Sequence, residues 1–336
     1  MGEAEISSEF EYSASFLRIL IPGVITVTLV SSLVVVKYFN YISFLKESVL
    51  TSVWNILPLG VIFVVVSMLI GFVINVFITP LTMMLEGYTL EKYQKNYIIS
   101  KFREVLKERQ WEKFNKYMYD YDSAETDSIE RGGAYTNIYY YFSYCLYKLS
   151  DNPNISDNEL KKGILPTKLG NVFKSMEIYP DWKYGMNGVF FWTRIQLLMP
   201  EENKNTLDKM RAFVDMFVEL TWIFFVAAIT YSIVLAFNED YILSGVSLIV
   251  FMLFSLFCYG MAVESALNFG LYVRSIFDLY REELWIKLKN GLFITLSSYT
   301  EKERWDKMFR HLWLYKKMQC PNCGKSYESI IGHKCE

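Results

Sequence analysis

The chain alternates between long apolar runs without charged side chains and segments in which charged and aromatic residues are mixed. The uncharged runs lie between Arg18 and Lys37, from Leu57 to Pro80, from Leu220 to Asn238, and from Tyr241 up to Glu264. About 20 consecutive apolar residues are enough for a helix to cross a bilayer. A charge at the bilayer centre costs about 2.5 to 3.5 kcal/mol. The sequence therefore predicts transmembrane helices at about 19–37, 57–79, 217–237 and 241–263.

The spacing of these spans groups them into two hairpins separated by a long insert and followed by a tail. Apolar residues recur at three- and four-residue steps in both the insert and the tail, which is typical of amphipathic helices. We therefore predict an all-α integral membrane protein. Its parts are an N-terminal segment with the first hairpin (1–80), a cytosolic helical insert (81–213), the second hairpin (214–264), a cytosolic helical tail (265–318) and a small metal knuckle (319–336).

Small residues and a proline distinguish the first hairpin. Ser67 and Gly71 interrupt the aliphatic second span, and small residues allow two membrane helices to approach closely. We expect the first two spans to pack against each other there. Pro22-Gly23 removes a backbone donor from the first span, so residues 16–21 are expected to form a separate turn.

The insert predicts mostly helical structure with polar breaks. An amphipathic helix is expected over 85–114, a loop over 120–133, a helix over 134–149 and a surface linker over 151–163. The apolar residues that follow one face of the first of these helices are Tyr93, Tyr97, Phe102, Val105 and Leu106.

The fourth span is expected to continue as a helix into the tail. One apolar face comprises Phe269, Val273, Ile276, Tyr280, Leu284 and Leu288. Arg274, Asp278 and Glu282 lie at four-residue intervals on another face. Thr300 and Glu303 have the spacing of a capping box and predict the start of a last helix.

Four residues near the C-terminus have the character of metal ligands. Cys320 and Cys323 form a Cys-x-x-Cys turn, and His333 and Cys335 follow close behind. Three thiolates and one imidazole are a common ligand set for structural zinc. We therefore expect one structural zinc ion per chain. Redox use of the Cys-x-x-Cys pair is the alternative, although no thioredoxin-like pattern surrounds it.

Charge distribution predicts the orientation and excludes one class of partner. The formal net charge is −2 and no dense basic run occurs, which argues against nucleic-acid binding. Lys and Arg resist translocation, and the loop from Asn238 to Asp240 contains neither. Both termini and the insert are therefore expected in the cytosol, with the spans in the cytoplasmic membrane. That compartment is reducing, so the five cysteines should be thiols or metal ligands.

A few polar residues lie at or inside the predicted membrane boundary: Asp215, Glu219, Glu264 and Asn75. Such groups can line an ion path or bind a cation. They can equally mark the water boundary and pair with nearby arginines, namely Arg211, Arg274 or Arg18. The second interpretation is the one we expect.

Two sequence blocks resemble those of a family of uncharacterised prokaryotic membrane proteins. The first block contains Leu165-Pro166-Thr167, Leu169-Gly170-Asn171, Glu177, Tyr179-Pro180, Tyr184-Gly185, Trp192, Arg194 and Pro200. The second contains Phe277-Asp278-Leu279-Tyr280-Arg281 with Leu284, and later Glu303-Arg304 with Trp305. The resemblance covers roughly residues 165–305. It implies a layout with four spans in a prokaryotic inner membrane and no known activity.

The residues of the first block also predict local structure. Thr167 can cap a helix that Pro180 would end, and Gly185 would turn the chain into an apolar helix over 186–199. That second helix is expected to be buried or to lie on the inner leaflet. Arg194 would then bind a carboxylate, with Glu177 as the candidate, or a lipid phosphate.

Sequence signals for enzyme activity are few. Only His311 and His333 offer an imidazole, and neither a P-loop nor a nucleophile-elbow pattern occurs. We therefore expect a non-enzymatic scaffold, sensor or effector that self-associates through its cytosolic module and can bind a cytosolic protein. A channel or transporter is the main alternative, and a membrane-bound hydrolase or lipid enzyme is the third class.

Overall fold

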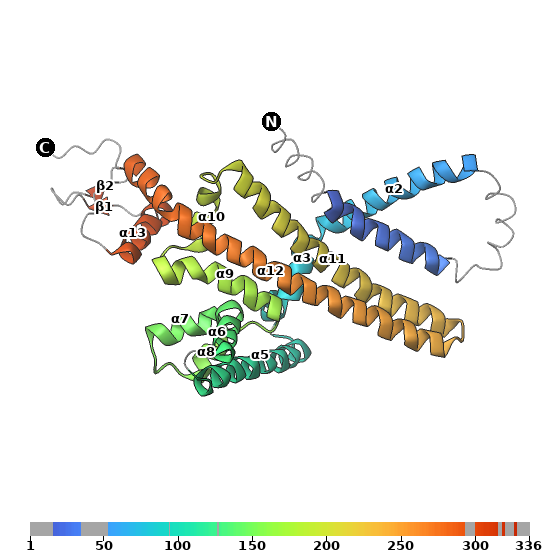
Figure 1. Cartoon of the computed structure of the whole chain (residues 1–336), viewed down its shortest axis with the longest axis horizontal. Coiled ribbons are helices and arrows are strands. Elements are labelled where there is room, and N and C mark those ends of the chain that lie inside the picture. The colour runs from blue at the N-terminus through green and yellow to red at the C-terminus, as the bar shows by residue number, and fades with distance from the viewer. Residues whose placement is uncertain are drawn as a thin grey trace. The chain divides into compact units, whose positions relative to one another are not determined.

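The computed structural model describes residues 16–34, 53–93, 95–125, 128–292, 300–314, 318–319 and 326–327. The described chain is almost entirely helical, as the hydrophobic pattern predicts (Figure 1). Three of its helices are long and apolar enough to cross a membrane, and a bent pair of helices supplies a fourth apolar segment.

The chain divides into two compact units. Unit 1 comprises Met1–Arg103 and Asn205–Phe269, and unit 2 comprises Glu104–Lys204 and Gly270–Glu336. Each of the long apolar segments lies wholly or for the most part in unit 1. The boundaries between the units lie inside helices, so the linkers expected from composition are not where the units separate.

The first hairpin of unit 1 is closely packed through small residues. It comprises the helix Phe16–Val34 and α2 (Val53–Val76). A Cβ atom added to Gly71 would lie 1.9 Å from the Ile19 carbonyl oxygen, and one added to Gly23 would lie 1.9 Å from that of Ser67. The helix from Phe16 is continuous through Pro22, so the separate turn expected before that proline does not form.

The second span is bent, which its uninterrupted apolar sequence did not predict. The helix stops at Val76 and resumes as α3 (Ile78–Glu86), with an angle of 53° between the two parts. Pro80 explains the break, because it has no N–H to donate to the Val76 carbonyl and its ring would clash with that carbonyl. Gly87, with a φ of 85°, then ends α3 and leads into α4 (Tyr88–Lys92).

The second hairpin comprises the two longest helices, α11 (Glu201–Phe237) and α12 (Tyr241–Leu292) (Figure 1). Within unit 1 they are joined by hydrogen bonds from the Ser255 hydroxyl to the Thr221 carbonyl (2.9 Å) and between the hydroxyls of Ser232 and Ser244 (3.0 Å). Met216, Leu220 and Cys258 form a buried cluster, against which side chains of the first helix also pack. Both α11 and α12 extend well beyond their predicted spans. We expected such an extension only for the fourth span, which lies in α12.

Unit 2 is a bundle of helices that includes the segments of α5 and α12 that belong to it. The helices are α5 (Tyr97–Ser123), α6 (Ile129–Tyr141), α7 (Ser143–Asp151), α8 (Asp157–Gly163), α9 (Lys168–Tyr184), α10 (Gly188–Gln196) and α13 (Glu301–Leu314). Helix α9 lies at the centre and contacts α6, α7, α10 and α13. It contributes Leu169, Val172 and Phe173, among other residues, to the core of this unit.

Three predictions for the insert need correction. Gly87 and the segment before Tyr97 divide the expected helix 85–114. Tyr93, Tyr97, Phe102 and Val105, which we predicted to form a packed face, are exposed, and Trp111 and Phe114 are buried instead. Helices α5, α6 and α8 enter the segments expected as a loop and a linker. Local sequence patterns misplaced these elements, because packing within a bundle can override the helix propensity of each segment.

Helix α9 begins where predicted and ends later than predicted. The Thr167 hydroxyl accepts a hydrogen bond from the Gly170 N–H (3.0 Å), which confirms the N-cap. Pro180 lies inside the helix, which continues to Tyr184 and ends at Gly185 with a φ of 72°. A Cβ on Gly188 would lie 2.7 Å from the Pro180 ring, so this glycine leaves room for the proline. Asn187 then caps α10 through the Phe190 N–H.

The predicted face of α12 and the predicted capping box of α13 are both confirmed. Val273, Ile276 and Leu284 are buried within unit 2. The Thr300 N–H donates to Glu303 Oε2 (3.0 Å) and the Glu303 N–H donates to the Thr300 hydroxyl (3.4 Å). Trp305 is then buried between the rings of Phe191 and Trp285.

The only strands in the described residues are β1 (Met318–Gln319) and β2 (Ser326–Tyr327), which pair antiparallel. All four predicted zinc ligands, Cys320, Cys323, His333 and Cys335, lie outside the described residues. The zinc site therefore stays a prediction.

Candidate functional site

Unit 1 contains a cluster of buried charges on α11, near the predicted start of the third span. Asp215 Oδ2 lies 2.9 Å from Arg18 Nη2 of the first helix, and Asp215 Oδ1 lies 3.0 Å from Arg211 Nε, one turn earlier on α11. The Asp215 side chain is only 4% exposed. A buried carboxylate is tolerated when cations compensate it, and Asp215 has two. These pairs connect the first helix to α11.

Glu219 lies one turn further along α11 and has a different environment. Its side chain is 0% exposed, and neither Oε1 nor Oε2 has a hydrogen-bond partner among the described residues. A buried polar group without a partner costs free energy, and a carboxylate costs more than a neutral group. Sequence analysis placed Asp215 and Glu219 in one class, whereas in the structure Asp215 forms two ion pairs and Glu219 has no hydrogen-bond partner among the described residues.

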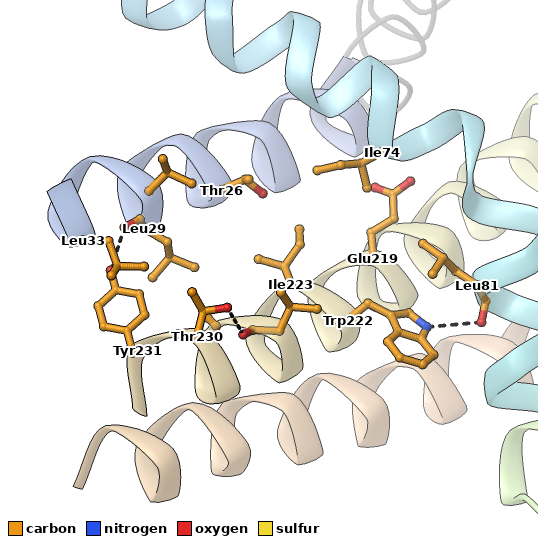
Figure 2. A pocket seen from close by; sticks show the side chains of 13 residues that line it. Thr26, Leu29, Leu33, Ile74, Leu81, Glu219, Trp222, Ile223, Thr230 and Tyr231 are labelled. Atoms are coloured by element: carbon orange, nitrogen blue, oxygen red, sulfur yellow. Dashed lines mark hydrogen bonds between the residues drawn. The ribbon is translucent and has the colours of Figure 1, made fainter. Parts of the chain in front are cut away.

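Glu219 lines a cavity of about 290 Å³ (Figure 2). The walls are formed by α11, the first helix and the bent pair α2 and α3. The lining residues are Thr26, Leu29, Val30, Leu33, Ile74, Leu81, Glu219, Trp222, Ile223, Val226, Ala227, Thr230 and Tyr231. The other polar groups of this wall already have partners. Thr26 and Thr230 donate to carbonyls of their own helices, and Tyr231 donates to the Leu29 carbonyl.

The bend in the second span contributes to this site. Trp222 Nε1 donates to the Leu81 carbonyl oxygen at 3.2 Å, which joins α11 to α3 just after the break (Figure 2). Asn75 and Thr82, the chain neighbours of the lining residues Ile74 and Leu81, each contain a buried oxygen without a partner among the described residues. Buried polar atoms without partners among the described residues therefore gather in this part of unit 1, and they include the donor Arg18 Nε as well as the Glu219 oxygens.

The other predicted boundary residues differ from Glu219. Glu264 on α12 is exposed and does not line the cavity. Asn75 is half-buried in the second span, near its bend. The structure thus distinguishes four residues that the sequence grouped by depth alone.

Arg194 has its contacts within α10. Its Nη1 donates to the Phe190 carbonyl oxygen at 2.7 Å, and its guanidinium lies 3.9 Å from the centre of the Phe190 ring. Pairing with Glu177 stays a prediction. Stacking on an aromatic ring accommodates an arginine because its planar cation is weakly hydrated.

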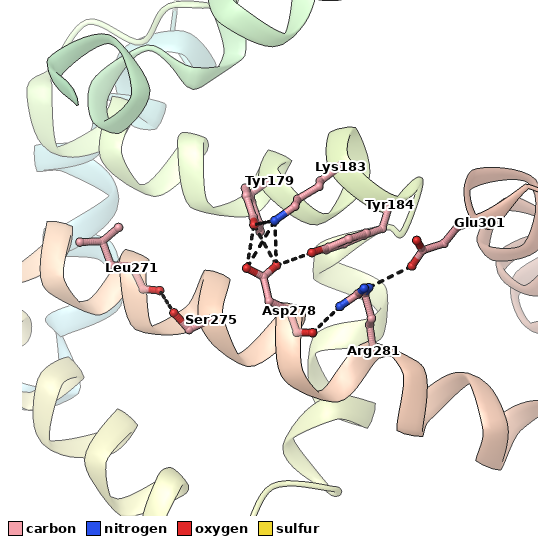
Figure 3. A network of polar contacts seen from close by, with 8 residues as sticks. All are labelled: Tyr179, Lys183, Tyr184, Leu271, Ser275, Asp278, Arg281 and Glu301. Carbon is pink, nitrogen blue, oxygen red and sulfur yellow. Dashed lines mark hydrogen bonds and ion pairs between the residues drawn. The ribbon is translucent and has the colours of Figure 1, made fainter. Parts of the chain in front are cut away.

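A network of polar contacts in unit 2 is centred on Asp278 of α12 (Figure 3). The Tyr179 hydroxyl donates to Asp278 Oδ1 (2.8 Å) and Oδ2 (2.9 Å), and the Tyr184 hydroxyl donates to Oδ1. Lys183 Nζ lies 3.4 Å from the same carboxylate, a half-exposed pair that contributes little. Burial, followed by the hydrogen bonds to Asp278, raises the pKa of both tyrosines above the usual value.

Arg274, one turn before Asp278, is a buried cation that sequence analysis placed on a polar face. It is 5% exposed, donates to the Ser143 hydroxyl at 3.2 Å and lies over the rings of Tyr139 (4.6 Å) and Tyr179 (5.3 Å). The tyrosine-rich composition of 134–149 was the available signal, because ring faces attract arginine. Which tyrosines would surround it depended on the fold.

Arg281 completes the attachment of α12 to its neighbours in unit 2. Its Nε donates to Glu301 Oε1 of α13 at 3.0 Å, and its guanidinium lies 4.2 Å from the centre of the Tyr184 ring (Figure 3). Asp278 and Arg281 therefore bind α9 and α13 from a single turn of α12. The arrangement therefore positions these helices relative to one another.

The two blocks singled out in the sequence lie together in unit 2. Tyr179 and Tyr184 of the first block contact Asp278 of the second, and the Trp192 ring lies 5.7 Å from that of Phe277. Asn171, also of the first block, bonds both the N–H (2.7 Å) and the carbonyl (3.0 Å) of Leu165. These residues therefore have structural roles in one core.

The remaining cysteines of the described chain have no metal-binding arrangement. Cys145 and Cys258 are buried free thiols, and burial raises the pKa of Cys145 to about 12. No group of three or more His, Cys, Asp or Glu side chains is placed to hold a metal ion in the ranges that the structure describes.

Comparison of the chain with protein-family models, with curated proteins and with solved structures finds no match.

Proposed function

We propose that the protein is a multi-pass protein of a prokaryotic cytoplasmic membrane, with both termini in the cytosol, which acts as a non-enzymatic sensor or effector. Unit 1 would be the membrane part and unit 2 the cytosolic part. Three apolar helices and one bent pair support membrane insertion. The lack of Lys and Arg between Asn238 and Asp240 supports the orientation.

The observation that carries this proposal is that α12 belongs to both units. One continuous helix of 52 residues contains the apolar segment of unit 1 and the Asp278 and Arg281 attachments of unit 2. A change in how α12 packs among the membrane helices can therefore alter its contacts with α9 and α13. A two-state element that both sites can bias is the physical requirement for such coupling.

Self-association and a cytosolic protein partner belong to the same proposal. At most 33% of the residues in the most apolar window of any candidate span are buried inside the chain. Lipid or further subunits would cover the rest. We expected the face of α12 from Phe269 to Leu288 to be covered by cytosolic packing or by another subunit. Its residues Val273, Ile276 and Leu284 are buried by the chain itself, so this face is no argument for an oligomer.

A perturbation of the membrane hairpin tests the coupling. Gly71→Ala forces the first helix and α2 apart, whereas Gly60→Ala, with nothing within 4 Å of the added Cβ, is the matched control. Amide hydrogen exchange of the full protein in nanodiscs should change in α9 and α13 for Gly71→Ala and stay at wild-type rates for Gly60→Ala. Wild-type exchange in both variants would contradict the proposal.

Orientation has its own test. A cysteine at Asn238 should react with an impermeant maleimide in intact cells, and one at Asn154 should react only after lysis. Labelling of the Asn154 variant alone would reverse the topology. Mass photometry of the protein in several mild detergents tests self-association, and a monomer in all of them would remove that part.

A further inference from the structure

We propose that the cavity beside Glu219 is a binding site for an apolar chain that ends in an ammonium group. The inference goes beyond the proposed function and shares with it only the placement of unit 1 in a bilayer. It rests on the cavity itself, the buried carboxyl group at one end of it and the arrangement of the lining residues.

The shape of the cavity fits a chain. Along α11 the lining residues extend from Glu219 to Tyr231 at steps of three and four, so they form one stripe. Twelve residues of helix extend about 18 Å at about 1.5 Å per residue. The facing stripe on the first helix extends from Thr26 to Leu33. A site of about 290 Å³ is larger than the roughly 150 Å³ apolar cavities that hold benzene.

The chemistry of the two ends differs. Glu219 lies beside Ile74 and Leu81 at one end, while Leu33 and Tyr231 lie at the other (Figure 2). The Tyr231 hydroxyl donates to the Leu29 carbonyl, so that end offers no free polar group from this side chain. Glu219 alone among the cavity-lining side chains combines complete burial with unpartnered oxygens. A ligand would therefore place its polar end at Glu219.

An ammonium group is the headgroup that Glu219 would recognise. Both carboxyl oxygens of Glu219 lack a hydrogen-bond donor among the described residues. Arg18 and Arg211 form their ion pairs with Asp215. An ammonium supplies three donors and a positive charge, whereas a choline headgroup has no N–H to donate. An anionic group in direct contact with Glu219 would be repelled.

Two sources can supply this chemistry, and both are apolar chains with a primary amine. One is an aminophospholipid of the membrane, whose headgroup would lie at the depth of Glu219, next to the predicted start of the third span. The other is a free long-chain amine. The shared requirement is a hydrogen-bonding cation on a chain that fits between α11 and the first helix.

Native mass spectrometry of the delipidated full protein in detergent tests the site. Phosphatidylethanolamine, phosphatidylcholine and phosphatidylglycerol with identical acyl chains are titrated in parallel, together with dodecylamine and dodecanol. We expect phosphatidylethanolamine to bind about tenfold more tightly than phosphatidylcholine, since a charge-assisted hydrogen bond has about that effect. Dodecylamine should likewise bind more tightly than dodecanol. Binding of dodecylamine without phosphatidylethanolamine would identify a free amine as the source.

Glu219→Gln preserves side-chain shape and removes the charge, so it should abolish the preference for the amine. Glu264→Gln is the matched control, because Glu264 is an exposed carboxylate at a similar predicted depth on α12. Equal binding of phosphatidylcholine and phosphatidylethanolamine to the wild type, with no preference for dodecylamine over dodecanol, would overturn the proposal without any variant. An unchanged preference in Glu219→Gln would overturn the assignment to this carboxyl group. Neither result bears on the coupling test with Gly71→Ala.

Discussion

At the scale of single residues, two glycines decide how closely the first helix and α2 approach each other. The positions of Gly23 and Gly71 have no room for a Cβ, since the facing atoms are backbone carbonyl oxygens that cannot rotate away. Gly60 is on the same helix as Gly71 and has open space around it. The same residue type therefore has a packing role at one position and none at another.

Gly71→Ala should lower the thermal stability of the detergent-solubilised protein. Overpacking of a tight contact costs about 1 to 3 kcal/mol, and here the Ile19 carbonyl would have to move. Gly60→Ala should leave stability unchanged or raise it slightly, because alanine favours helix more than glycine. Differential scanning fluorimetry of both variants checks this, and an equal melting temperature for the two would contradict the contact.

Because of the tyrosines that contact Asp278, we expect the folded protein to lose stability at high pH. The folded-state pKa of Tyr179 and Tyr184 is raised, so the neutral form is favoured by folding. Their contribution is therefore complete below the unfolded value of about 10 and is lost as the pH rises from there toward the folded value.

Thermal unfolding in detergent at pH 9 to 11 should show this loss, and Tyr179→Phe with Tyr184→Phe should reduce it. Tyr119→Phe is the control, because Tyr119 is 72% exposed. An identical pH dependence in the double variant and the wild type would exclude these tyrosines as its cause.

At the scale of elements, helix ends follow local rules, while helix interiors follow the packing around them. Thr167, Asn187 and Thr300 cap helices through their own side chains. In contrast, Pro180 remains inside α9, and Pro80 bends the second span. A proline removes one hydrogen bond in either case, and the neighbouring elements determine whether the helix continues.

The capping box at the start of α13 predicts a local effect that can be measured. Hydrogen bonds from the Thr300 backbone and hydroxyl lower the pKa of Glu303. The cap is therefore complete above the unfolded value and weakens as the pH falls through the folded one. Thr300→Ala should increase hydrogen exchange of the first-turn amides of α13, whereas Thr300→Ser should preserve protection. Equal exchange in both variants would show that the cap has no effect.

At the scale of the whole molecule, the chain comprises two units that share long helices. Residues far apart in sequence form each core: in unit 1 the first helix contacts α11, and in unit 2 α9 contacts α12 and α13. Ile276 is 2% exposed within unit 2, so Ile276→Asp should unfold this unit rather than separate subunits. Mass photometry of the wild type, and not of this variant, is therefore the test of self-association.

The predicted knuckle should hold one zinc ion per chain. Elemental analysis should find about one zinc in the wild type and none after Cys320→Ser with Cys323→Ser, because two thiolate ligands are removed. Cys145→Ala should retain zinc, since the buried Cys145 thiol has a pKa of about 12 and does not supply a thiolate. Unchanged zinc in the double variant would exclude the site.

The sequence by itself determined the features that depend on neighbouring residues. Exclusion of charge located the long apolar segments, helical spacing identified the buried face of α12, and capping spacing located the starts of α9 and α13. These patterns can be read because a helix repeats every few residues and a cap involves the next turn. The apolar face predicted for α5 was wrong, because its residues Tyr97, Phe102 and Val105 are exposed. Which face of a helix is covered depends on the helices that pack against it, and residues nearby in the sequence do not determine that.

Only the tertiary structure decided which polar residues have partners. Asp215 and Glu219 are one turn apart on the same helix, yet of the two only Asp215 forms an ion pair with Arg18 of the first helix. Likewise, Arg274 is buried because Ser143 and Tyr139 come from another element. Burial and partnership depend on atoms more than a hundred positions away in the chain, and the free energy of a buried charge depends on both.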